Sequence, residues 1–154
     1  MWTWAATGAL SGVMVMPGAA VAAPAPGPEA DLAFHGTAVM NGDMVEVRLT
    51  PRNNGPAAVA DATVRLRWSA ALAEEQRLPA RCAREGERTV VCGTGALTAN
   101  AVGERLDVPV QMKDRASQVT LEIEPVWGSG TTDRDHTNDR LNVLVLDTGD
   151  AYAF

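Results

Sequence analysis

The chain has 154 residues, a length that allows one domain once its ends are set aside. Hydrophobic residues make up 46% of it and charged residues 21%, a balance that excludes an intrinsically disordered chain. The formal net charge is −6 and Lys113 is the single lysine, which excludes the clustered basic surface that nucleic-acid binding requires. We therefore expect one small globular domain and no nucleic-acid partner.

The N-terminal segment predicts export from the cell. Residues 5–15 are small, apolar and uncharged, and Ala20-Val21-Ala22 has the small-residue pattern that signal peptidases cleave. We expect residues 1–22 to be a signal peptide, although residues 1–4 carry none of the basic charge that usually opens one. A membrane anchor is the alternative, but the apolar run is shorter than the roughly 20 residues that a spanning helix needs.

Residues 23–30 are rich in proline and alanine and predict an extended linker. The sequence shows no second apolar span. The mature chain is therefore expected to be secreted or extracellular, with no membrane span.

From Asp31 onward, apolar and polar residues alternate, which predicts β-strands with one buried and one solvated face. The alternating segments are 32–35, 45–50, 62–68, 105–112 and 119–124. Turn sequences separate them, among them Asn41-Gly42-Asp43 and Asn53-Asn54-Gly55-Pro56, whose Asn and Gly tolerate positive φ. About seven strands joined by turns predict an all-β, two-sheet antiparallel β-sandwich over residues 31–146, with a closed barrel as the alternative.

Two segments depart from this alternation. Residues 69–77 are good helix formers and predict a short helix, or a loop with one helical turn. The last predicted strand, 141–146, is apolar on both faces, because Leu144 and Leu146 lie on the face that should be polar. A C-terminal tail, residues 147–154, follows it.

Cys82 and Cys92 are the only cysteines, and export would place them in an oxidising compartment. A turn at Glu85-Gly86-Glu87 lies between them, so the two thiols can face each other across a hairpin. We expect a disulfide, which in the chain-entropy model would stabilise the fold by about 2.5–3 kcal/mol. A redox or metal pair is the alternative, but it lacks the C-x-x-C spacing and a third ligand.

Four motifs in order resemble the bacterial surface conserved-repeat domain, an envelope module of the N-x-G-P type. They are the strand and turn at 47–57, Leu78-Pro79, the hairpin from Cys82 to Cys92 with Gly93 to Leu97 after it, and the turn Asp135-His136-Thr137-Asn138-Asp139. Asp139 stands where the family usually has a second Asn. The resemblance implies an immunoglobulin-like sandwich over residues 31–146, and it implies no catalytic site.

For three candidate sites, the residue pattern favours a structural role over catalysis or ligand binding. A Ser129-His136-Asp135 triad would lack the G-x-S-x-G elbow of the serine nucleophile. Calcium ligation by Asp133, Asp135 and Asp139 competes with ordinary side-chain hydrogen bonds to the turn backbone, and Arg134 and Arg140 are interleaved. Trp68 and Trp127 share the inward parity of their strands, which favours core packing over stacking on a glycan. We therefore expect neither an enzyme nor a cofactor or metal.

Leu144 and Leu146 remain as the candidate partner-binding residues, because exposed apolar patches mark contact sites. The alternative is that the tail 147–154 covers them with Tyr152 and Phe154. The expected function is a secreted, non-catalytic immunoglobulin-like domain with a structural, adhesion or interaction role at the bacterial cell exterior, binding a protein or a cell-envelope component. The second hypothesis is a free secreted binding protein, such as an inhibitor of an extracellular enzyme.

Overall fold

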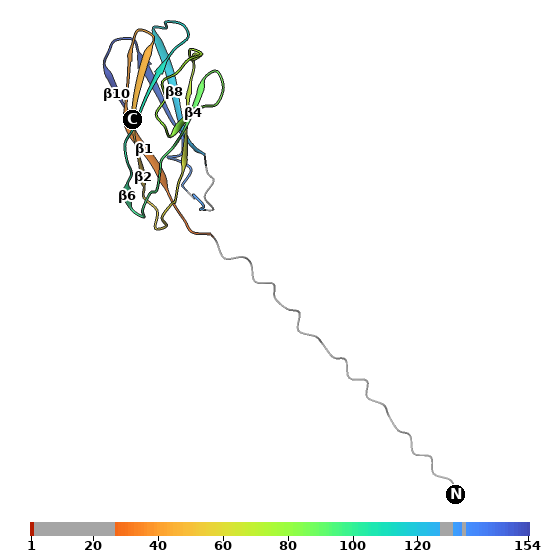
Figure 1. Ribbon diagram of the computed structural model, residues 1–154. Helices are drawn as coiled ribbons and strands as arrows, with labels where there is room; N and C mark the ends of the chain where they lie inside the picture. The colour runs from red at the N-terminus through yellow and green to blue at the C-terminus, as the bar shows by residue number, and fades with distance from the viewer. Residues whose placement is uncertain (2–26, 127–130, 134) are drawn as a thin grey trace.

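The computed structural model describes Met1 and residues 27–126, 131–133 and 135–154. They form two antiparallel sheets of five strands each, packed face to face (Figure 1). The described residues contain no helix, so the predicted all-β two-sheet sandwich is confirmed. The strands are β1 (Leu32–Asn41), β2 (Met44–Asn53), β3 (Thr63–Trp68), β4 (Cys82–Arg84), β5 (Thr89–Gly93), β6 (Ala101–Val102), β7 (Leu106–Gln111), β8 (Gln118–Val126), β9 (Leu141–Leu146) and β10 (Ala151–Ala153).

The first sheet has the order β10-β1-β2, with β6 and β7 both paired to the far side of β2. The second has the order β4-β5-β3-β8-β9. The hairpin of β1 and β2 is paired along its full length, from Leu32 opposite Asn53 to Asn41 opposite Met44. Its turn is where the sequence predicts it, with Gly42 at a φ of 68°, a left-handed conformation that favours glycine.

The core lies between the two sheets and is made by the alternating apolar residues of both. Trp68 is 1% exposed, which confirms its predicted burial. It lies among large buried side chains from both sheets, which include Phe34, Leu66, Leu121 and Ile123. Trp127 lies outside the described residues. The inward-facing residues of each strand therefore supply the apolar area whose burial drives folding.

The helix-prone segment 69–77 is not helical. Leu72 is buried and forms a bridge with Met112, and the backbone N–H of Ala73 donates to the carbonyl of Gln111. The Gln76 side chain completes this contact, because its amide accepts the N–H of Gln111 and donates to the carbonyl of Gln111. Burial of Leu72 and pairing to the end of β7 thus override a weak helix propensity.

The domain begins earlier than the sequence predicts. Glu29 forms a parallel bridge with Thr132, and Ala30 is fully buried in the core. The carbonyl of Glu29 also accepts the N–H of Ala57. The predicted linker 23–30 therefore ends before Glu29. Although the composition predicts a spacer there, Glu29 is bound by two loops that are distant in sequence. Residues 2–22, most of the predicted signal peptide, lie outside the described residues.

The domain also ends later than predicted. Residues 151–153, which the sequence pattern predicted to be part of a tail, form β10 and pair with β1. Gly36 and Phe154 exchange backbone hydrogen bonds of 3.0 and 3.1 Å that extend this pairing. Alternation could not reveal a strand of three residues, whose existence depends on the open edge of β1.

Candidate interaction surface

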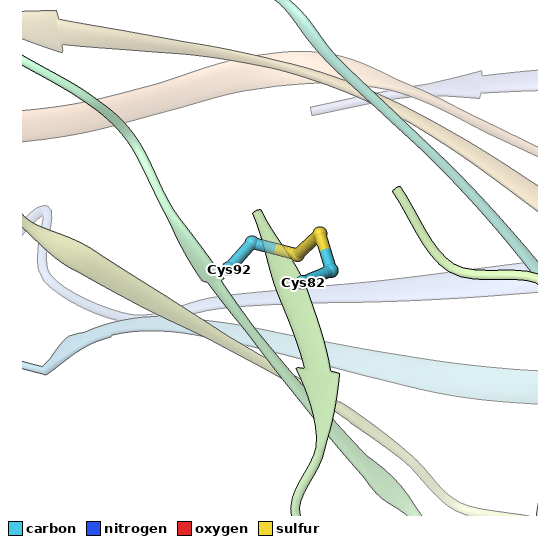
Figure 2. The surroundings of a disulfide bond; sticks show 2 residues. All are labelled: Cys82 and Cys92. Carbon is cyan, nitrogen blue, oxygen red and sulfur yellow. A yellow bond between two sulfur atoms is a disulfide. The ribbon is translucent and has the colours of Figure 1, made fainter. Parts of the chain in front are cut away.

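Cys82 and Cys92 are bonded to each other, as expected, with an S–S distance of 2.02 Å (Figure 2). They are directly opposite each other on β4 and β5, with Cα atoms 4.0 Å apart. The neighbouring hydrogen bond from Gly93 N–H to the Arg81 carbonyl makes this a non-hydrogen-bonded pair, the closer of the two antiparallel pair types. Cys92 is fully buried, so the bond ties the short edge strand β4 to the core.

We expect the double variant Cys82→Ala/Cys92→Ala to lose about 3 kcal/mol of unfolding free energy, because the uncrosslinked denatured chain is less constrained. Urea denaturation of variant and wild type measures the difference. The sandwich should remain folded at room temperature. An unchanged urea midpoint would contradict this stabilising role.

The N-x-G-P turn is held by the side chain of Asn53, which is fully buried. Its Oδ1 accepts the N–H of Gly55 at 3.0 Å, and its Nδ2 donates to the carbonyl of Ala57 at 2.7 Å. Gly55 is needed for space: a Cβ there would lie 2.5 Å from the Cα of Ala30. Glycine is required here because the N-terminal segment approaches closely. The positive φ that the turn sequence suggested is not the reason.

The acidic loop after residue 130 binds backbone groups. Asp133, which is 5% exposed, accepts the N–H of Leu32 at 3.2 Å and that of Asp135 at 2.9 Å. Burial raises the pKa of Asp133, while these two amides oppose the shift. Asn138 donates to the carboxylate of Asp31 at 2.8 Å. The loop therefore fastens the N-terminal segment to the domain, and the described residues contain no cluster arranged to hold a metal ion.

The ring of His136 hydrogen-bonds to Asp139, whereas the acid of the triad would be Asp135. Its Nδ1 lies 2.5 Å from Oδ2 of Asp139, whose hydrogen bond raises the pKa of His136. Asp135 accepts the N–H of Thr137 instead, at 3.1 Å. Ser129 lies outside the described residues. The two residues of the triad that are described therefore point to turn stabilisation.

Leu144 and Leu146 lie on the outer face of β9, at the edge of the second sheet. Leu144 is 49% exposed, whereas its neighbours Val143 and Val145 are buried. Leu144 stands opposite Thr120 and Leu146 opposite Gln118 on β8, so the residues directly across from the two leucines are uncharged. Leu146 is half-buried. Leu144 is therefore exposed on the face that the sequence predicted, whereas Leu146 is covered in part.

The C-terminal tail leaves Leu144 exposed. Its strand β10 is joined to β1 in the other sheet, and Tyr152 and Phe154 pack against the core. Their place in the first sheet removes them from the outer face of the second, where Leu144 lies. The alternative in which Tyr152 and Phe154 cover both leucines is thus contradicted for Leu144.

Beside the two leucines, the outer face of the second sheet is charged. Arg65 bridges Glu85 at 2.9 Å and Glu124 at 3.1 Å. Arg140 bridges Glu124 at 2.8 Å and Glu122 at 3.0 Å. The hydrogen bond from Arg140 lowers the pKa of Glu124 most, and the hydrogen bond from Arg65 adds to this effect. Partial burial of Glu124 raises its pKa but is outweighed. These five charged side chains are bound to one another in ion pairs, so the apolar end of the sheet is its distinctive surface.

The other edges of the two sheets are short or blocked. Strands β4 and β10 have three residues each. On β7, Pro109 lacks the N–H that an added strand would need. The backbone N–H and carbonyl of Gln111 are already hydrogen-bonded to the side chain of Gln76. Strand β9 has six residues, and no strand of the described chain pairs with its outer edge. Sequence alternation identified the leucines, but it could not show that their strand is an edge.

No family model matches the sequence, and no curated protein matches it. Within the part of the chain that the structure describes, no helix is long and apolar enough to cross a membrane.

Proposed function

We propose that this chain is a secreted, non-catalytic interaction module of the bacterial cell exterior, and that β9 is its contact strand. The observation that carries the proposal is the combination of an unpaired six-residue edge and the exposed Leu144 on the same strand. Proteins usually protect such edges with charges, proline or a covering loop. The edge of β7 is protected in this way, and β9 contains no charge and no proline.

Edge strands bind extended segments by continuing the sheet, with affinity from backbone hydrogen bonds and specificity from alternate side chains. A protein partner is therefore favoured over a polysaccharide. The Cys82–Cys92 disulfide is compatible with an extracellular site of action. The resemblance to the surface conserved-repeat domain supports attachment to the cell exterior.

The alternative is a free secreted binding protein, such as an inhibitor of an extracellular enzyme. Such a protein would bind its target through the same open edge of β9. The two hypotheses differ in where the exported protein is found, because an envelope module stays with cells and a free binder accumulates in the medium.

We expect the wild-type protein to be retained on cells, and Leu144→Asp to shift it into the medium, since a carboxylate on the contact face cannot be buried without cost. Immunoblots of washed cells and of medium measure the ratio. Thr37→Asp, on the first sheet, is the matched control and should leave the ratio unchanged. Wild-type protein found only in the medium would favour the free binder.

A further inference from the structure

The direction of the backbone groups decides what can pair with β9. The N–H of Asp147 donates to the carbonyl of Ser117, which continues the ladder between β8 and β9. Donors and acceptors alternate sides along an antiparallel strand, so the odd-numbered residues of β9 face β8. Asn142, Leu144 and Leu146 therefore direct their N–H groups to the open edge. On this side, the carbonyl of Leu146 accepts the N–H of Thr148 at 2.8 Å.

The side chains restrict the added strand further. On β9, Val143 and Val145 face the core, whereas Leu144 and Leu146 face outward. An added strand would therefore lie beside apolar side chains on both of its faces. A strand that fits must therefore be uncharged and largely apolar on both faces. Among the described strands with an open edge, β9 itself, Leu-Asn-Val-Leu-Val-Leu, meets this requirement. The edge is complementary to a second copy of itself.

We propose that β9 pairs antiparallel with β9 of a second copy of this chain, joining the two second sheets across a two-fold axis at Leu144. The inference rests on the proposed function, because it names a partner for the same strand. Each copy uses the same surface, as a two-fold interface requires. Leu144 of each copy lies opposite Leu144 of the other, and Asn142 lies opposite Leu146.

The charges at the two ends of β9 are paired within each copy and are compatible with this register. Arg140 precedes the strand and Asp147 follows it. Antiparallel pairing centred on Leu144 places Arg140 of one copy opposite Thr148 of the other. Arg140 keeps its bridges to Glu122 and Glu124, and Asp147 keeps its bridge to Arg115, so both charges stay paired in the dimer. Pairing centred on Val143 would instead set Asp139 opposite Asp147, which is unfavourable.

The association is expected to be weak and concentration-dependent, because one strand pair buries less than the roughly 1,200 Å² of a standard stable interface. Sedimentation velocity of the mature, disulfide-bonded chain from about 5 to about 500 µM tests it, a range that brackets micromolar dissociation constants. We expect the mass to rise from monomer to dimer. A monomer over the whole range would overturn the inference.

A charge swap tests the register. Leu144→Asp and Leu144→Lys should each weaken association at least about tenfold, because like charges at the two-fold axis repel. An equimolar mixture of the two variants should form the heterodimer, since residue 144 of one copy faces residue 144 of the other. Thr37→Asp should dimerise as wild type does. Variants that associate as wild type does, or a mixture that stays monomeric, would overturn the inference.

This experiment separates the inference from the proposed function. If the wild type is monomeric but Leu144→Asp releases it from cells, the strand binds another protein and the second copy is excluded. If the wild type dimerises while Leu144→Asp leaves cell retention unchanged, the dimer stands and the proposed role of β9 in attachment fails. Near-ultraviolet circular dichroism of each variant verifies folding, which the exposure of Leu144 should preserve.

Discussion

We expect Gly36→Ala to destabilise the domain by about 4 kcal/mol or more, a loss reserved for severe core disruption. A Cβ at Gly36 would lie 1.9 Å from the carbonyl oxygen of Arg48 and 2.9 Å from the Phe154 ring. Arg48 is on β2, and its backbone cannot move away without opening the hairpin of β1 and β2. The variant should therefore lose the long β1–β2 pairing and the attachment of β10 together.

Urea denaturation, or the soluble yield if the variant does not fold, measures the effect. Thr37→Ala is the matched control, since Thr37 is the next residue of β1 and points to the outer face. The control should change the unfolding free energy by no more than about 0.5 kcal/mol. A Gly36→Ala protein with wild-type stability would mean that the two strands can separate locally without cost.

We expect Asn53→Ala to lower the unfolding free energy by about 2–4 kcal/mol, because it leaves buried partners without hydrogen bonds. The N–H of Gly55 and the carbonyl of Ala57 are the two closest of these partners. Methyl replacement also leaves a cavity beside the N-terminal segment, which adds to the cost. Thermal or urea unfolding measures the change.

The adjacent Asn54 supplies the control. Its side chain is exposed and accepts a hydrogen bond from Arg52 at 2.7 Å, so Asn54→Ala should cost no more than about 0.5 kcal/mol. Asn53→Asp keeps the acceptor but loses the donor and buries a charge, so it should be at least as damaging as Asn53→Ala. Equal, small effects at both positions would show that the turn is held by other contacts.

Local sequence patterns were sufficient for much of the fold. Alternation of period two determined the main strands and their inward faces, because side chains on a strand point alternately to opposite sides. Burial of Trp68 followed from this parity. The pairing of Cys82 with Cys92 was equally local, since both lie in one hairpin around a turn. The two leucines of β9 were found in the same way.

Long-range contacts decided the rest. Segment 69–77 has helix-forming residues, but the buried Leu72 and the exposed end of β7 hold it in an extended loop. The domain ends were misjudged because Glu29 and Ala151–Ala153 are ordered only by partners far along the chain. Such pairings leave no periodic signal in a short segment.

The sequence by itself determined that this protein is a disulfide-bonded β-sandwich with two anomalous leucines on its last predicted strand. Only the tertiary structure decided that β9 is an open sheet edge, that the tail joins the other sheet, and that Leu144 is exposed. The physical reason is that side-chain parity is a property of one strand. Which strand lies at an edge, and what covers it, depends on every pairing in the sandwich.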